Sequence, residues 1–76
     1  MKGEVIRLVA EKGFGFIRCG KVDYFFHRSD FSGHWKDLEV DMKEKNLVPV
    51  EFEEENSRKG PRASNVRRAD FPNIGS

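Results

Sequence analysis

The sequence has few of the residues that crosslink or anchor small proteins. Its 76 residues include one cysteine, Cys19, so no disulfide can form within the chain. One cysteine and two histidines are a poor set for a structural zinc site, which usually takes four ligands, and we expect neither a metal nor another cofactor. A chain without disulfides suits a reducing compartment, so we expect a cytoplasmic location.

Long apolar runs and catalytic signatures are also missing. No apolar run approaches the roughly 20 residues that a transmembrane helix needs, and no charged stretch followed by an apolar one marks a secretory signal. The sequence holds no glycine-rich phosphate loop with its Lys-Ser/Thr pair. Asp23 and His27 are four residues apart on an expected strand, too far for a general base and the group that orients it. These absences argue against a membrane protein and against an enzyme.

The net charge of +1 conceals a separation of charge along the chain. Residues 37–55 hold eight acidic residues and two lysines, a net of −6, and the rest of the chain has a net of +7. A positive field over one part of a molecule favours anionic partners. The acidic part is either a solvating surface or a site that docks a basic protein.

Five short segments are expected to be strands, and the first four contain several β-branched or aromatic residues, which is typical of strands. They are Gly3–Ala10, Phe14–Cys19, Val22–His27, Leu47–Glu54 and Arg62–Arg68. Tight turns join the first three into an antiparallel meander. Residues 28–46 are expected to be irregular, with one helical turn at residues 38–45. Five short strands without a long helix predict an all-β protein, a small closed or partly open barrel.

The second and third strands alternate in a way that separates two faces. Ile17, Tyr24 and Phe26 share the face that we expect to be buried. The opposite face carries an aromatic platform of four residues: Phe14, Phe16, Phe25 and His27. Large rings facing solvent are costly unless they meet a partner, and Gly13 and Gly15 are expected to leave room for a flat one. The competing interpretation is that both faces are buried.

Cations border this platform, and the combination favours one class of ligand. Lys12, Arg18 and Lys21 flank the rings in the sequence. Single-stranded nucleic acids bind where bases stack on aromatic rings and phosphates meet positive charge. The pattern therefore predicts a surface for single-stranded RNA or DNA.

Three motifs resemble one known family. The stretch "KGFGFI" (Lys12–Ile17) matches the first ribonucleoprotein motif of the cold-shock domain family, and "YFFH" (Tyr24–His27) matches the second. The ending "KGPRASNV" (Lys59–Val66) resembles the family's usual KGPQAANV. The resemblance covers about residues 2–69. It implies a five-stranded antiparallel barrel of the OB type, with a long irregular loop between strands 3 and 4, that binds single-stranded RNA or DNA. The domain is expected over residues 1–70, with residues 71–76 as a flexible tail.

The sequence departs from the family pattern at several positions. Arg7 stands where the family usually has Trp, Arg28 follows the motif histidine where the family has Phe, and Arg62 replaces a Gln. Trp35 takes the place of a Phe in the long loop. The segment between Leu38 and Val50 is longer than usual, and the added length at residues 39–46 is acidic. A guanidinium group still stacks on bases and also binds phosphate, so these changes bear on base preference and affinity more than on the fold.

The expected function is sequence-tolerant binding of single-stranded RNA or DNA, acting as an RNA chaperone that holds strands unpaired. The predicted contact residues are aromatic or basic: Arg7, Lys12, Phe14, Phe16, Phe25, His27, Arg28, Trp35, Lys59 and Arg62. The alternative is a protein-interaction module that docks a basic partner through the acidic segment and binds little nucleic acid. Arg7 and the acidic insertion favour the alternative, and the intact motifs favour nucleic-acid binding.

Overall fold

Six strands and one helix make up the part of the chain that the structure describes, residues 1–58 and 60–69 of a computed structural model. The elements are β1 Lys2–Val9, β2 Phe14–Cys19, β3 Val22–His27, β4 Phe31–Ser32, α1 Trp35–Lys43, β5 Pro49–Ser57 and β6 Gly60–Arg68. Short 3-10 turns at Ala10–Lys12 and Arg28–Asp30 follow β1 and β3. The predicted bounds of β2 and β3 are confirmed to the residue. In contrast, β5 starts and ends later than expected and β6 starts earlier.

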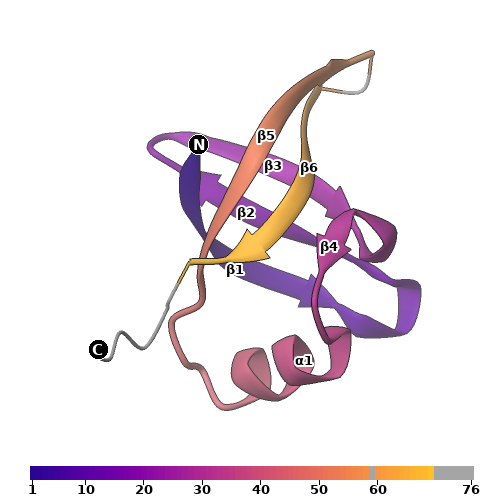
Figure 1. Ribbon diagram of the computed structural model, residues 1–76, viewed down its shortest axis with the longest axis vertical. Helices are drawn as coiled ribbons and strands as arrows, with labels where there is room; N and C mark the ends of the chain where they lie inside the picture. The colour runs from indigo at the N-terminus through magenta and orange to yellow at the C-terminus, as the bar shows by residue number, and fades with distance from the viewer. Residues whose placement is uncertain (59, 70–76) are drawn as a thin grey trace.

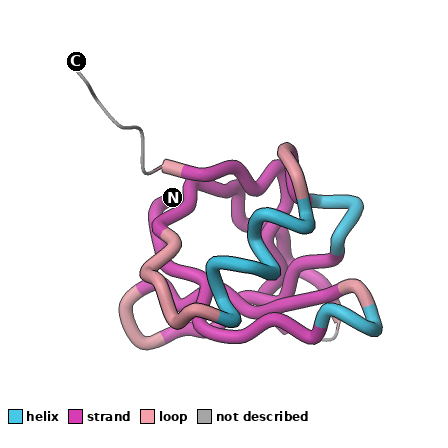
Figure 2. Tube along the Cα trace, turned by 90° about the horizontal axis from the view of Figure 1, so that it is seen from below, coloured by secondary structure: helices cyan, strands magenta, loops and turns pink. Residues whose placement is uncertain are grey.

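The strands form one sheet in the order β3-β2-β1-β5-β6-β4 (Figure 1). A further pairing between β3 and β6, at Phe25 and Arg62, closes five of the strands into a barrel. The neighbours in the barrel are antiparallel except at this closure, where the pairing is parallel. Seen from below, α1 lies across one end of the barrel (Figure 2). The predicted all-β barrel is confirmed.

The core fills the inside of this barrel with the side chains that the alternation predicts. Ile17, Phe26 and Val50 are completely buried, as expected from their positions in β2, β3 and β5. Among the residues that the structure describes, the buried apolar core consists of Val5, Ile17, Tyr24, Phe26, Phe31, Trp35, Leu38, Val48, Val50, Phe52, Ala63 and Val66. Burying a large apolar side chain contributes about 1.5–3 kcal/mol, so this cluster is the main source of the fold's stability.

The segment after β3 is more ordered than the sequence suggested. Residues 28–46 contain a 3-10 turn, the short strand β4 and the helix α1 in place of an irregular loop. Trp35 and Leu38 are the buried residues of α1, and Met42 packs against the core from one turn further on. This spacing places all three on one face of a helix. The helix is stabilised by that apolar face, because nine residues are too few to hold a helix alone.

Gly15 has a different role from the one expected of it. It is buried, and a Cβ atom at this position would lie 2.8 Å from the carbonyl oxygen of Arg7 and 2.9 Å from Cε1 of Phe26. Such distances are too short for packed atoms, so glycine allows β1 and a core ring to approach β2 closely. The expectation that Gly15 leaves room for a ligand is therefore wrong. Gly13 ends the first 3-10 turn with a φ of 75°, which favours glycine.

Within residues 1–58 and 60–69, no helix has the length and apolar character needed to cross a membrane. The same residues contain no group of three or more His, Cys, Asp or Glu side chains placed to hold a metal ion.

Candidate nucleic-acid interface

The aromatic platform is built from cross-strand pairs on the outer face of β2 and β3. Phe14 lies opposite His27, and Phe16 lies opposite Phe25. A two-residue turn joins the strands, and Gly20 adopts a φ of 65° there. This kind of turn fixes the register of a hairpin, and the register puts the four platform residues side by side.

The three phenyl rings form one continuous apolar surface. The ring centroids of Phe14 and Phe25 are 5.3 Å apart, and the Phe16 ring lies 5.9 Å from each of the other two. Phe16 meets both neighbours edge to face, which is a favourable geometry for aromatic pairs. The three rings are half-buried, since each covers part of the others. The interpretation that both faces of these strands are buried therefore does not hold, and a base stacking on the platform would cover the remaining ring surface.

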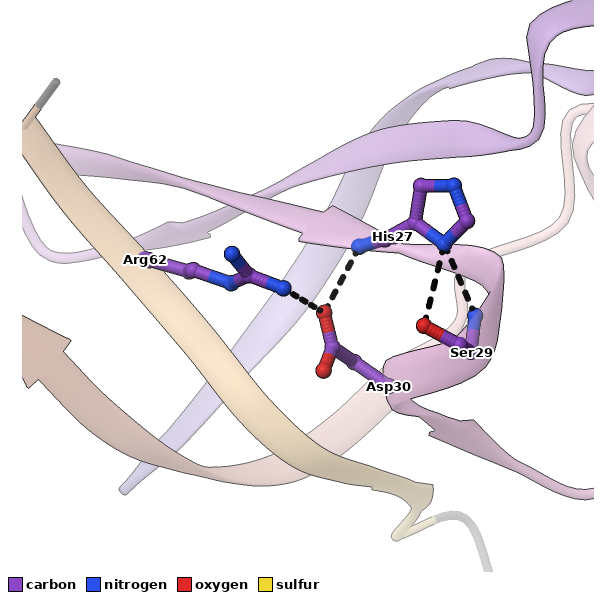
Figure 3. Close-up of polar contacts among 4 residues, drawn as sticks. All are labelled: His27, Ser29, Asp30 and Arg62. Carbon is purple, nitrogen blue, oxygen red and sulfur yellow. Dashed lines mark hydrogen bonds and ion pairs between the residues drawn. The ribbon is translucent and has the colours of Figure 1, made fainter. Parts of the chain in front are cut away.

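His27 is exposed at the end of β3, and the following turn orients its ring (Figure 3). The backbone N–H of Ser29 donates to Nδ1 of His27 at 3.1 Å, and the hydroxyl of Ser29 lies 3.0 Å from the same atom. Because Nδ1 accepts the backbone hydrogen bond, the neutral ring carries its proton on Nε2. The ring therefore presents a hydrogen-bond donor on its other edge.

Asp30 connects this turn to β6. Its Oδ2 accepts a hydrogen bond from the backbone N–H of His27 at 3.0 Å and another from Nη2 of Arg62 at 3.0 Å (Figure 3). The two contacts tie the end of β3 to a residue that is 32 positions away from Asp30 in the sequence. Arg62 is thereby held at the edge of the platform, next to Phe25 in the strand register.

Three further predicted cations border the platform on other sides. Arg7 lies on β1 opposite Phe16. Lys12 precedes Gly13, whose carbonyl oxygen accepts a hydrogen bond from the backbone N–H of Arg28 at 2.8 Å. This bond brings the turn that carries Lys12 close to Arg28. All three side chains are exposed, and none forms an ion pair with any residue that the structure describes.

Near the turn that joins β2 and β3, two residues of opposite charge form an ion pair. Nε of Arg18 donates to Oδ1 of Asp23 at 2.9 Å across β2 and β3. The hydrogen bond from Arg18 holds the pKa of Asp23 below its ordinary value, and the same bond raises the pKa of Arg18. The charge of Arg18 is therefore partly compensated, unlike the charges of Arg7, Lys12 and Arg28.

A cavity of about 370 Å³ opens beside the platform, where β3 meets the hairpin of β5 and β6. Among the described residues, its lining is formed by Phe16, Phe25, Ser57, Gly60, Pro61 and Arg62. The sequence did not predict the part taken by Ser57, Pro61 or Asp30. His27 and Asp30 form a capping box at the second 3-10 turn, but His-x-x-Asp is not the usual Ser/Thr-x-x-Glu/Gln signature by which a sequence indicates one.

Trp35 lies in the core and not on the platform. It is 6% exposed, and its ring packs against Phe26 at 6.0 Å and Phe31 at 6.2 Å. This corrects the expectation that Trp35 offers an accessible ring to a nucleotide. Trp35 is the first residue of α1, and it lies on the face of the helix that packs against the core. The predicted contact at Lys59 and the predicted tail lie outside the described residues.

Comparison with known proteins gives the family. The model of the "cold-shock" DNA-binding domain matches residues 1–69. The chain belongs to the cold-shock domain family. Two similar relatives are the probable cold shock protein A of Mycolicibacterium smegmatis and that of Mycobacterium tuberculosis, each 42% identical over 69 residues. Each alignment covers 87% of this chain and 94% of the relative.

Membership in the cold-shock domain family agrees with the geometry of the platform. Cold-shock domains generally bind nucleic acid, and the two motifs that carry the resemblance form β2 and β3. Three of the expected departures from the family pattern are arginines, and Arg7, Arg28 and Arg62 all border the platform. The departures therefore change the rim of the surface and leave its rings in place.

Proposed function

We propose that this protein binds single-stranded RNA or DNA with little sequence preference. Bases stack on the aromatic platform, and the phosphates between them meet Arg7, Lys12 and Arg28. One observation carries the proposal: a continuous surface of three phenyl rings lies beside cations that have no carboxylate partner in the described chain. Unpaired cations keep the full charge that a phosphate requires.

The magnitudes fit a protein that keeps weakly structured strands open. Stacking on an aromatic side chain contributes about 1–3 kcal/mol per base, while a step of duplex DNA is worth about 1.4 kcal/mol. Three rings therefore compensate for the loss of a few stacked base pairs and not for a long helix. We propose that the protein acts as an RNA chaperone on such short or marginal pairings.

A titration tests this proposal directly. Fluorescence anisotropy of an end-labelled pyrimidine-rich oligonucleotide should rise on adding the protein, while a stable duplex of the same strand should bind more weakly. Trp35 is buried, so its fluorescence should report unfolding better than contact with a base. An oligonucleotide that fails to bind at low salt would rule the proposal out.

The chaperone activity needs a separate measurement. A hairpin with a short stem, labelled with a fluorophore and a quencher, should open on adding the protein, and a hairpin with a long stem should stay closed. Binding to the pyrimidine-rich strand without opening of the short stem would retain the binding function and reject the chaperone role.

A further inference from the structure

Arg62 differs from the other cations around the platform because its charge is already compensated. Its Nη2 donates to Asp30 at 3.0 Å, and the side chain of Asp30 is only 17% exposed. Glu55 lies directly opposite Arg62 in the pairing of β5 and β6. A phosphate approaching Arg62 would meet these two carboxylates as well, so Arg62 is a poor site for neutralising phosphate.

The guanidinium of Arg62 nevertheless keeps hydrogen-bond donors. Its Nε is buried without a hydrogen-bond partner among the described residues, and no described residue accepts from Nη1. A guanidinium group has donors only, so it pairs only with acceptors. The bond to Asp30 holds the group in one place, and a donor that is already fixed loses less entropy on binding a ligand.

The cavity beside Arg62 has the size and lining of a small-molecule site. Its volume of about 370 Å³ falls in the range of roughly 300–1,000 Å³ that is usual for such sites. Phe16, Phe25 and Pro61 supply apolar walls, and Arg62 supplies the donors. Phe25 and Arg62 are neighbours in the strand register. A base that stacks against the Phe25 ring therefore has its edge within reach of the guanidinium.

We infer that this cavity takes one base of the bound strand and that Arg62 reads it, with a preference for guanine. The inference rests on the proposed function and adds a base preference to a surface that otherwise tolerates any sequence. Asp30 is the positioning residue, because it holds the guanidinium in place and cancels its charge.

The preference follows from the acceptors on each base. Guanine offers two neighbouring acceptors, O6 and N7, and the pairing of arginine with them is the commonest specific contact between proteins and bases. Adenine places a donor beside N7. Thymine and uracil place a donor between their two carbonyl groups. Cytosine offers the neighbouring acceptors N3 and O2, but its smaller ring covers less of the Phe25 ring than a purine does.

The test uses labelled oligothymidylates of about seven nucleotides, within the usual site size of an OB fold. A single guanine is placed at each position in turn, and the affinity is measured by anisotropy at one salt concentration. At one position, the oligonucleotide with guanine should bind about 5- to 150-fold more tightly than the oligonucleotide with thymine. At that position 7-deazaguanine, which lacks N7, should lose most of the gain. Inosine keeps O6 and N7 and should retain the gain.

Variants identify the residue that reads the base. In Arg62→Gln, the ratio of the two affinities should fall to the small value that stacking of a purine on Phe25 provides alone, because glutamine lacks the guanidinium fork. Arg67→Gln is the matched control, since Arg67 is another arginine of β6 held by a carboxylate, Glu51, at 3.1 Å, and it does not line the cavity. Its ratio should equal that of the wild type. Thermal melting followed by Trp35 fluorescence checks that each variant is folded.

The salt dependence of binding separates base reading from phosphate binding. Each phosphate contact contributes about −0.7 to the log–log slope for a single strand. Arg62→Gln should leave the slope unchanged, and Asp30→Asn should make it steeper, because the freed guanidinium then attracts phosphate. A purely structural role for Asp30 would not change the slope in this direction.

Three results would overturn the inference while leaving the proposed function intact: no position prefers guanine, cytosine is preferred over guanine, or the full preference survives in Arg62→Gln. A slope reduced by about 0.7 in Arg62→Gln would also overturn it, because Arg62 would then be a phosphate contact. If the wild type binds no oligonucleotide at any salt concentration, the proposed function fails and this inference fails with it. The wild-type scan with 7-deazaguanine needs no variant and decides the point even if Arg62→Gln does not fold.

Discussion

The cations on two outer surfaces of the barrel differ in whether they have a carboxylate partner. Around β1–β3, Arg7, Lys12 and Arg28 have no carboxylate partner within the described residues. On β6, Arg67 binds Glu51 at 3.1 Å, and Arg68 binds a carboxylate of α1 at 2.5 Å. Acidic and basic residues that lie in different parts of the sequence are therefore paired in the folded molecule. The acidic segment supplies the carboxylates that pair with Arg67 and Arg68, whereas Arg7, Lys12 and Arg28 have no such partner among the described residues.

This comparison also bears on the two functions that the sequence left open. A docking site for a basic partner needs carboxylates that are free to meet it. Glu51 and Asp41 already hold Arg67 and Arg68, and Glu53 accepts a hydrogen bond from Asn65 at 3.3 Å. The platform, in contrast, presents rings and cations without such partners. These pairs compensate part of the acidic segment, and we therefore propose nucleic acid rather than a basic protein as the partner.

The largest effect is expected in the core that supports both surfaces. Phe26→Ala should lower the free energy of unfolding by about 3–5 kcal/mol, because this ring is completely buried. A domain of this size has a stability of about 3–5 kcal/mol, so the variant should be largely unfolded at 25 °C. Phe25→Ala, at the next position on β3, is the matched control and should melt cooperatively in the same denaturation experiment. If Phe25→Ala unfolds and Phe26→Ala does not, the two faces have been assigned the wrong way round.

The next effect concerns the platform itself. Phe14→Ala, Phe16→Ala and Phe25→Ala should each weaken binding of an oligothymidylate by about 1–3 kcal/mol, since each removes a ring on which a base stacks. Val22→Ala is the control, because Val22 is an exposed apolar residue of β3 outside the platform. Anisotropy titrations of folded variants provide the measurement. Equal losses in Val22→Ala and Phe25→Ala would show that bases do not stack on these rings.

The cations give a smaller effect that distinguishes the two surfaces. Arg7→Gln, Lys12→Gln and Arg28→Gln should each reduce the log–log salt slope of binding by about 0.7, the contribution of one phosphate contact. Arg67→Gln removes an arginine that is already paired, so its slope should match that of the wild type. The slopes are measured by titration at several salt concentrations. A reduced slope in Arg67→Gln alone would place the strand on β6 and reverse the comparison.

A pH effect is expected where α1 meets β6. The hydrogen bond from Arg68, and then that from Asn46, holds the pKa of Asp41 below its ordinary value. The stabilisation that this lowered pKa represents is present above the pKa of an aspartate in the unfolded chain, about 3.9. It is lost as the pH falls through the lower pKa that Asp41 has in the folded protein. The melting temperature should therefore fall more steeply below about pH 4 in the wild type than in Asp41→Asn. Asp37→Asn, on the same helix, should follow the wild type.

The smallest effect is expected on the acidic face of β5. Replacing Glu53 and Glu54 together by Gln should change oligonucleotide affinity little at physiological salt, where the Debye length is about 8 Å. The reason is the strand order, in which β5 neighbours β1 and β6 and not β2 or β3. Binding that strengthens as much as it weakens in Lys12→Gln would mean that these carboxylates act on the platform.

The alternation along the strands was readable from the sequence alone. A strand turns successive side chains to opposite faces, so the positions of Phe16, Ile17, Phe25 and Phe26 determined both the core and the platform. The tight turn at Gly20 then fixed which residues of β2 and β3 lie opposite each other. These are local rules, and they apply without knowledge of the rest of the chain.

What depended on distant parts of the chain was decided by the tertiary structure. Trp35 is buried because the apolar face of its helix packs against the end of the barrel. The barrel is formed by strands distant in the sequence, so the residues next to Trp35 in the sequence do not reveal this packing. Gly15 is required by the backbone of β1 and by a ring of β3. The pair of Asp30 and Arg62 joins residues 32 positions apart, and it turns a cation expected to meet phosphate into a fixed donor with its charge compensated. The charge of a residue follows from its type and is known from the sequence. Whether that charge is compensated depends on which side chains the fold brings within hydrogen-bonding distance.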